Sequence, residues 1–151
     1  MATLKPGDKA PEFNAIDQDG KPINLSDYKE KKVILYFYPK DNTPGCTDEA
    51  CSLRDGYQDL TKQGYDVIGV SADSTASHQG FIKKHSLPFR LISDPDKKLI
   101  QAYGAWGEKK MYGKSYEGII RSTFIIGTDG KIESVIEKVK TKDHANQVLQ
   151  G

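Results

Sequence analysis

The chain has 151 residues and a formal net charge of +1, a length that suits one domain with its own core. Because the charges balance, we expect no basic surface for nucleic acid or for an anionic membrane. The N-terminus lacks an apolar segment behind its charged residues, and the longest apolar run, Val33 to Pro39, is far too short to span a bilayer. These features predict a single cytoplasmic domain over residues 1–151.

Two cysteines, Cys46 and Cys51, stand out in a chain that does not need a disulfide to fold. In a reducing compartment such a pair is more typical of catalysis or metal binding than of a structural bridge. The three histidines, His78, His85 and His144, lie in polar helical stretches with no ligand spacing to the cysteines, so we expect them to be solvated. A C-x4-C pair alone is a poor zinc site. The sequence therefore predicts thiol chemistry without a metal or cofactor.

The first predicted elements lead to the cysteines. A DQDGK turn at Gly20 predicts a hairpin, and the run Lys32 to Pro39 predicts a buried strand rich in β-branched and aromatic residues. Next, Thr43 suits the N-cap of a helix and Pro44 its first position. Because apolar residues then recur at three- and four-residue steps, we expect this helix to run to about Gln63.

Strands and helices alternate along the rest of the chain. Strands are expected over 66–71 and 89–92, helices over 75–85 and 95–103, then a hairpin of strands 122–126 and 131–137 and a closing helix over 143–149. Parallel strands need crossover connections, so the alternation favours an α/β fold, whereas the last hairpin adds antiparallel strands. The predicted architecture is thioredoxin-like, with a mixed central sheet flanked by helices.

Cys46 falls in the first turn of the predicted helix, where unpaired N–H groups and the helix dipole favour a thiolate. An unperturbed cysteine would be only ~3% ionised at neutral pH, so its surroundings matter. Asp48 and Glu49 oppose a nearby anion. A cation would offset them, and Arg121 is the candidate, provided that the strand after it lies beside the strand that ends at Pro39.

These residues also have purely structural interpretations. Cys46 could be an inert buried thiol, and Cys51 could be a small residue that a helix tolerates without a function. The hydroxyl of Thr43 could serve only as an N-cap, which is compatible with a second role in substrate binding. Arg121 could be a surface cation, as most arginines are. The spacing of the residues alone does not decide between these interpretations.

The segment PKDNTPGCTDEAC, from Pro39 to Cys51, resembles the active-site loop of peroxiredoxins, with the pattern proline, three residues, threonine, two residues, cysteine. The second cysteine, five residues later, is similar to that of the Q-type peroxiredoxins, also called bacterioferritin comigratory proteins. Downstream, Arg121 lies in the segment WGEKKMYGKSYEGIIRSTFIIGTDGKI and matches the second active-site position of the family. The resemblance covers nearly the whole chain.

The resemblance implies a role for each matching residue. Cys46 would be the peroxidatic cysteine and Cys51 the resolving cysteine, while Thr43 and Arg121 would orient the peroxide and Pro39 would shield and shape the loop. The implied enzyme is an antioxidant peroxidase that reduces hydrogen peroxide and organic hydroperoxides through an intramolecular disulfide. The family also implies thioredoxin as the reductant and a monomeric protein.

Two other functions stay open at this point. A thioredoxin-like dithiol/disulfide oxidoreductase would share the fold, but such enzymes normally use C-x-x-C, whereas four residues separate the two cysteines here. A redox-sensing interaction module would not need rapid chemistry, and its thiols would oxidise slowly and without selectivity when hydrogen peroxide is added.

Overall fold

The computed structural model describes residues 4–28, 30–111 and 113–150. The strands are β1 (Asn14–Asp17), β2 (Pro22–Asn24), β3 (Lys32–Phe37), β4 (Tyr65–Ser71), β5 (Arg90–Ser93), β6 (Trp106–Met111), β7 (Lys114–Ile119), β8 (Ser122–Ile126) and β9 (Ile132–Ile136). The helices are α1 (Pro44–Asp55), α2 (Tyr57–Lys62), α3 (Thr75–His85), α4 (Lys98–Ala102) and α5 (His144–Gln150), with a 3-10 helix η1 over Leu25–Tyr28.

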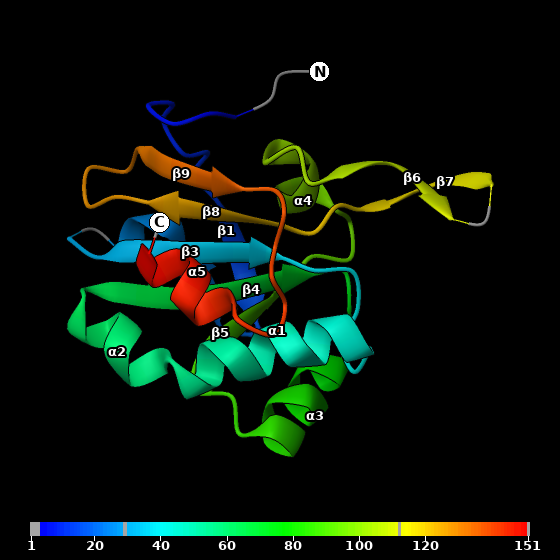
Figure 1. The fold of residues 1–151 in the computed structure, drawn as a ribbon, viewed down its shortest axis with the longest axis horizontal. Coiled ribbons are helices and arrows are strands. Elements are labelled where there is room, and N and C mark those ends of the chain that lie inside the picture. Colours follow the sequence, from blue (N-terminus) through cyan, green and yellow to red (C-terminus); the bar gives the residue numbers. More distant parts are fainter. Residues whose placement is uncertain (1–3, 29, 112, 151) are drawn as a thin grey trace.

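The central sheet has seven strands in the order β2-β1-β5-β4-β3-β8-β9. β3 lies in its interior, parallel to β4 and antiparallel to β8, and β4 is parallel to β5. β6 and β7 form a separate antiparallel pair that projects from one end of the molecule (Figure 1). The predicted mixed α/β sheet, with the antiparallel hairpin at its end, is therefore confirmed.

The sheet separates two hydrophobic cores. Because side chains alternate across a strand, β3 contributes to both cores, one of which contains Val33, Leu35 and Phe37 and the other Ile34 and Tyr36, followed by Tyr38. The first core is closed by residues of α4 and of the N-terminal hairpin. The second is covered by α1, α2, α3 and α5, and Figure 1 shows α1 and α5 in front of the sheet.

The single helix expected from Pro44 to about Gln63 is wrong in one respect, because Gly56 divides it into α1 and α2. A Cβ atom at Gly56 would lie 2.5 Å from the Cβ of Ala145 in α5. The close approach of α5 therefore leaves no room for a side chain at this position. The expected apolar face is present, since Ala50, Leu53 and Leu60 are buried.

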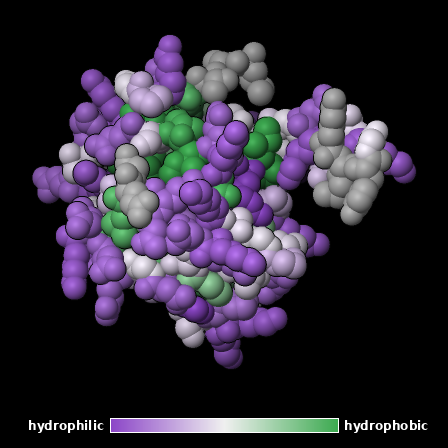
Figure 2. All heavy atoms as spheres, in the orientation of Figure 1, coloured by the Kyte–Doolittle hydropathy of each residue, from purple (hydrophilic) through white to green (hydrophobic). Residues whose placement is uncertain are grey.

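The outer surface over α1 and α5 is mainly hydrophilic (Figure 2). Among the described residues the large exposed apolar side chains are Ile16, Tyr116 and Ile120. Tyr116 belongs to β7 and Ile120 follows that strand, so two of the three lie on the projecting hairpin or at its end. Within the described ranges, none of the helices combines the length and the apolar character that crossing a membrane requires.

Candidate active site

Cys46 lies just beyond the end of β3, as the third residue of α1, and its side chain is buried, with 2% of its surface exposed. The helix begins at Pro44, and the Thr47 N–H donates the first helical hydrogen bond to the Thr43 carbonyl at 2.8 Å. The Thr43 hydroxyl does not cap the helix as we expected, because it donates to the Lys40 carbonyl at 2.8 Å. This bond fixes the hydroxyl at the entrance to the helix, beside the first turn that carries the thiol.

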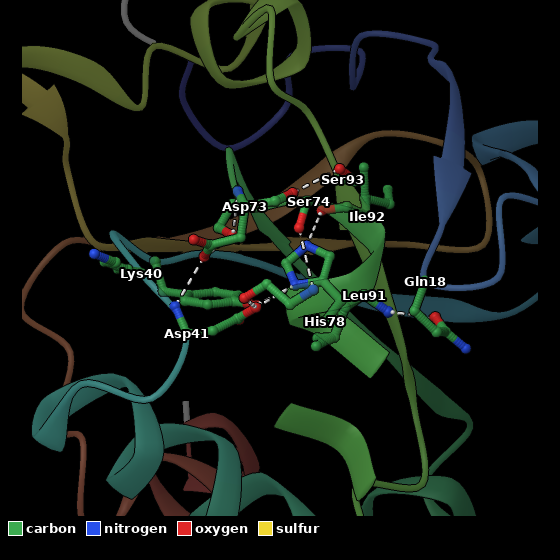
Figure 3. Close-up of polar contacts among 12 residues, drawn as sticks. Gln18, Lys40, Asp41, Asp73, Ser74, His78, Leu91, Ile92 and Ser93 are labelled. Atoms are coloured by element: carbon green, nitrogen blue, oxygen red, sulfur yellow. Dashed lines mark hydrogen bonds and ion pairs between the residues drawn. The ribbon is translucent and has the colours of Figure 1, made fainter. Parts of the chain in front are cut away.

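A buried polar network anchors the loop between β3 and α1 (Figure 3). The Asp41 N–H donates to Asp73 Oδ2 at 2.8 Å. The Asp41 carboxylate accepts from the Tyr38 hydroxyl at 2.6 Å and from the Ser77 hydroxyl at 2.8 Å, and it lies 2.7 Å from His78 Nδ1. The loop that precedes Cys46 is thereby tied to β4 and to α3.

His78 is fully buried in this network, so the expectation that it is solvated is wrong. Its Nε2 lies 2.9 Å from the Ile92 carbonyl, which can only accept, so Nε2 carries a proton. Asp41, Asp73 and His78 could in principle hold a cation, but their polar atoms are already occupied by hydrogen bonds within the protein.

Arg121 reaches the thiol from the neighbouring strand. β8 pairs with β3, Phe37 faces Ser122 across the ladder, and Arg121 comes immediately before β8. Its Nη2 donates to Cys46 Sγ at 3.2 Å. The guanidinium occupies the space beside Gly45, where an added Cβ would lie 3.2 Å from Nη2. The contact that the sequence could only suggest is thus present.

The same guanidinium also binds Glu49, with Nη1 donating to Oε1 at 2.6 Å. Glu49 is fully buried on the inner face of α1, and its Oε2 has no hydrogen-bond donor among the described residues. Burial raises the pKa of Glu49 to about 7, although Arg121 opposes this shift. Burial alone would lower the pKa of Arg121, but Glu49 and Cys46 outweigh burial and raise it. The thiol and the carboxyl therefore compete for one permanent cation.

His144, at the start of α5, lies behind Glu49 and is also fully buried, contrary to the expectation. The Gln147 amide donates to the Lys138 carbonyl at 2.8 Å, so its oxygen faces His144 Nδ1, also at 2.8 Å, and Nδ1 donates. Nε2 then accepts from the Thr123 hydroxyl at 2.8 Å and lies 3.6 Å from Glu49 Oε2. Burial lowers the pKa of His144, which favours this neutral ring.

A second cation approaches the site from the projecting hairpin. Lys109 of β6 donates from Nζ to the Ile119 carbonyl at 2.9 Å. Burial lowers its pKa, Arg121 lowers it further, and Cys46 opposes both. Lys109 therefore adds positive charge near the thiol, which the sequence alone did not suggest because the hairpin was not expected.

Cys51 lies further along α1, and both cysteines are free thiols. The structure thus brings Thr43, Cys46 and Arg121 together at the start of the helix, with a half-buried Pro39 beginning the loop. Cys51 is kept apart on another part of the same helix. Its Sγ instead lies 3.8 Å from Nδ1 of His85, at the end of α3.

Comparisons with known proteins agree on the family. The model of the AhpC/TSA family matches residues 6–135. Peroxiredoxin Bcp of Escherichia coli (strain K12) is 48% identical over 149 residues, which cover 99% of this chain and 96% of that protein. Peroxiredoxin Bcp of Bacillus subtilis (strain 168) is 47% identical over 148 residues, covering 98% of this chain and 94% of that protein.

Solved structures give the same result for the fold. PrxQ of Xylella fastidiosa superposes with a TM-score of 0.92 at 35% identity, covering 99% of this chain and 96% of that one. The bacterioferritin comigratory protein of Xanthomonas campestris, studied for alkyl peroxide reduction, superposes with a TM-score of 0.85 at 37% identity, covering 91% and 88%. The chain therefore belongs to the AhpC/TSA family and, within it, to the Bcp or Q-type peroxiredoxins, which are thiol-dependent peroxidases.

Proposed function

We propose that Cys46 is the peroxidatic cysteine and that its thiolate attacks the terminal oxygen of a hydroperoxide. The S–O bond forms as the O–O bond breaks, the departing oxygen takes a proton and leaves as water or an alcohol, and Cys46 becomes a sulfenic acid. The observation that carries this assignment is the 3.2 Å contact from Arg121 Nη2 to Cys46 Sγ. A guanidinium so close donates a hydrogen bond to the attacking sulfur and is positioned to stabilise charge on the departing oxygen.

Thr43 and Pro39 complete the proposed peroxide site. The Thr43 hydroxyl donates to the Lys40 carbonyl, which leaves its oxygen lone pairs free to accept a hydrogen bond from the peroxide. Pro39 has no N–H and a fixed φ, so it stiffens the start of the loop. The half-buried positions of Pro39 and Thr43 are consistent with a shielded pocket beside the thiol.

Cys51 is proposed to resolve the intermediate. Its thiolate attacks the sulfenic sulfur of Cys46, an S–S bond forms, and hydroxide leaves and is protonated to water. An external dithiol then restores both thiols by exchange, and we propose thioredoxin in this role. The alternative of a thioredoxin-like reductase has no comparable support, because the four-residue spacing departs from C-x-x-C.

The proposed substrates are hydrogen peroxide and organic hydroperoxides. The Xanthomonas relative is described as having alkyl peroxide reduction activity, which supports the organic class. We further propose that the protein is a single domain and a monomer and that it acts in the cytoplasm. Sedimentation at several protein concentrations tests the monomeric state, and cell fractionation tests the location.

Single-turnover kinetics of two variants test the assignment of the cysteines. Cys46→Ser should abolish peroxide consumption, because it removes the attacking sulfur. Cys51→Ser should consume one equivalent of peroxide at the wild-type rate and then stall as the sulfenic acid with thioredoxin as donor. Stopped-flow measurement of peroxide loss, with mass analysis of the quenched protein, distinguishes the two. Equal loss of the first turnover in both variants would contradict the division of roles.

A further inference from the structure

Cys51 and His85 form a contact that the chemistry at Cys46 does not use. Cys51 Sγ lies 3.8 Å from His85 Nδ1, where the outer side of α1 meets the last residue of α3. Three residues after the cysteine, Arg54 Nη1 donates to the His85 carbonyl at 2.8 Å. The imidazole also packs edge-on against Phe81, with ring centroids 5.3 Å apart. These contacts hold the ring against the sulfur.

Resolution needs Cys51 as a thiolate, yet this thiol lies far from the cations of the peroxide site. A thiol without such help is mostly protonated at neutral pH. A neutral imidazole in the Nε2–H tautomer presents the Nδ1 lone pair, and in this structure Nδ1 is the nitrogen that faces Cys51 Sγ. Histidine is the side chain that enzymes use most often as a general base.

We propose that His85 is a catalytic base for the resolving step. This inference rests on the proposed function and adds one residue to the resolving step, in which Cys51 attacks the Cys46 sulfenic acid. The Cys51 S–H proton passes to His85 Nδ1, and the thiolate attacks the sulfur of the Cys46 sulfenic acid. The S–S bond forms, the S–O bond breaks, and the departing hydroxide takes up the proton to leave as water. No other oxidant or reductant enters this step.

His85 can act as the base only if Cys51 stays close to it during resolution. The half of α1 that follows Cys51 is held firmly, since Leu53 is fully buried and the Ser52 hydroxyl oxygen accepts from the Ala145 N–H of α5 at 3.2 Å. The other half contains Gly45, which lowers the local helix propensity. In the proposed step Cys46 leaves its contact with Arg121 and reaches Cys51, which stays beside His85.

The charged groups around the contact between Cys51 and His85 do not take over the role of accepting the Cys51 proton. On α1, Arg54 Nε donates to the Asp55 carboxylate at 2.9 Å, so the acidic neighbour partly neutralises the guanidinium. That hydrogen bond is the main reason why the pKa of Arg54 is raised, with a smaller contribution from Cys51. On α3, Lys83 and Lys84 precede His85 and are exposed to solvent, where their charge is strongly screened.

A rapid-quench experiment separates the two steps. Reduced protein is mixed with one equivalent of hydrogen peroxide, quenched with acid and alkylating reagent, and analysed by mass for sulfenic acid and disulfide. In His85→Gln the first step should proceed at the wild-type rate, whereas disulfide formation should slow by at least about tenfold at neutral pH. The difference should shrink as the pH rises, because a thiol that loses its proton to solvent no longer needs a base.

Lys84→Gln is the matched control, because it removes an exposed charge from the same turn of α3 without touching Cys51. It should resolve at the wild-type rate at every pH. An unchanged or faster disulfide step in His85→Gln, with circular dichroism and the first step both normal, would overturn the role of His85 and leave the proposed function intact. Failure of wild-type Cys46 to form a sulfenic acid would overturn both.

Discussion

Arg121 lies between two acidic groups, the Cys46 thiol at 3.2 Å and the Glu49 carboxyl at 2.6 Å. A cation stabilises whichever of the two groups is ionised, and each anion disfavours the other. Both groups therefore compete for hydrogen bonds from the same guanidinium. Because burial already holds the pKa of Glu49 at about 7, a proton resides on the carboxyl for part of the time at neutral pH. During that time the whole charge of Arg121 is available to the thiolate.

Arg121→Lys should not behave as a conservative change. A single ammonium group lacks the planar fork with which the guanidinium contacts the thiol and the carboxyl at once. Losing one charge-assisted hydrogen bond in the transition state should raise the barrier by ~2 to 3 kcal/mol, or slow the reaction with peroxide roughly a hundredfold. Stopped-flow measurement of the second-order rate with hydrogen peroxide tests this. A rate within about threefold of wild type would remove Arg121 from the chemistry.

Glu49 should make the protein less stable as the pH rises. Its pKa is about 7 in the folded chain against an ordinary value of 4.5, so the folded state binds the proton more tightly than the unfolded state. The resulting stabilisation is complete below about pH 4.5 and is lost as the pH rises through about 7. This shift corresponds to about 3 kcal/mol in the free energy of unfolding.

Glu49→Gln isolates that contribution, because the amide cannot titrate but can still accept from Arg121. Urea unfolding under reducing conditions, at about pH 4.5 and 8, should show wild type losing about 3 kcal/mol relative to the variant. His144 has the opposite effect, since its lowered pKa destabilises the fold only as the pH falls. Because His144 lies 3.6 Å from Glu49 Oε2, the two proteins are also compared in a His144→Gln background, which removes this second titration. Parallel pH profiles for the two proteins would show that the pKa of Glu49 is the same in the folded and unfolded states, which would contradict this account.

Local signals in the sequence were enough to place Cys46 in the first turn of a helix and to nominate Arg121 as its neighbour, because a strand-to-helix corner and the start of a neighbouring strand are both visible there. Glu49 was recognised only as an acidic neighbour. Its partners come from β8 and α5, more than 70 residues away in the chain. His85 was missed for the same reason, since its contact with Cys51 spans 34 residues. Periodicity describes one element at a time and does not report such contacts.

At the scale of elements, α1 poses a geometric problem for the disulfide. Cys46 and Cys51 are five residues apart in one continuous helix. Such a step rises 7.5 Å and turns 140°, which places the two Cα atoms ~8.7 Å apart on different sides. Cα atoms joined by a disulfide usually lie about 4.4 to 6.8 Å apart. The bond therefore requires part of α1 to unwind.

Hydrogen exchange should locate this unwinding in the first half of the helix. On oxidation, amides over residues 47–50 should lose protection, because their acceptors belong to the turn that opens, whereas β3 should keep its protection. Circular dichroism should show a small loss of helix. The comparison is between reduced protein and protein whose intramolecular disulfide is confirmed by mass, with peroxide-treated Cys51→Ser as the control. Undiminished protection over 47–50 in the oxidised protein would contradict this account.

Element boundaries followed the sequence where the stop signals are local. Helix α3 has the bounds expected for it, with Ser74 accepting at its N-cap from the Ser77 N–H and Ser86 in the left-handed region at its end. The pair of β6 and β7 was not expected, because its strands are largely polar and pair with each other outside the main sheet. The break between α1 and α2 falls at Gly56, a residue of low helix propensity that the apolar periodicity does not take into account.

At the scale of the whole molecule, the central sheet contributes side chains to both cores, and the candidate site borders one of the two. Cys46 belongs to the core covered by α1, α3 and α5, together with alternate residues of β3. The remaining residues of β3 belong to the opposite core. If the side chains of one core separate from β3, that face of the strand is exposed to solvent, and the strand also supports the other core. The folding of the peroxide site is therefore coupled to residues far from it.

We expect residues 1–151 to form one domain, and one domain predicts a single cooperative unfolding transition. Residues 1–3, 29, 112 and 151 lie outside the described part of the chain. Two probes report on the two sides of the sheet. Trp106, the sole tryptophan, packs against the first core, whereas far-ultraviolet circular dichroism is dominated by helices, most of which cover the second core. If the sheet couples the cores, both signals should give the same urea midpoint and the same slope.

The measurement is made with reductant present, because formation of the disulfide would open α1 and add a second process. Leu53→Ala provides a directed perturbation, since Leu53 is fully buried in the second core and its truncation should cost about 2 to 5 kcal/mol. In a cooperative molecule this loss lowers the midpoint of the Trp106 fluorescence by as much as that of the dichroism, although Trp106 is on the other side of the sheet. A dichroism midpoint that falls while the fluorescence midpoint stays fixed would show that the two cores unfold separately.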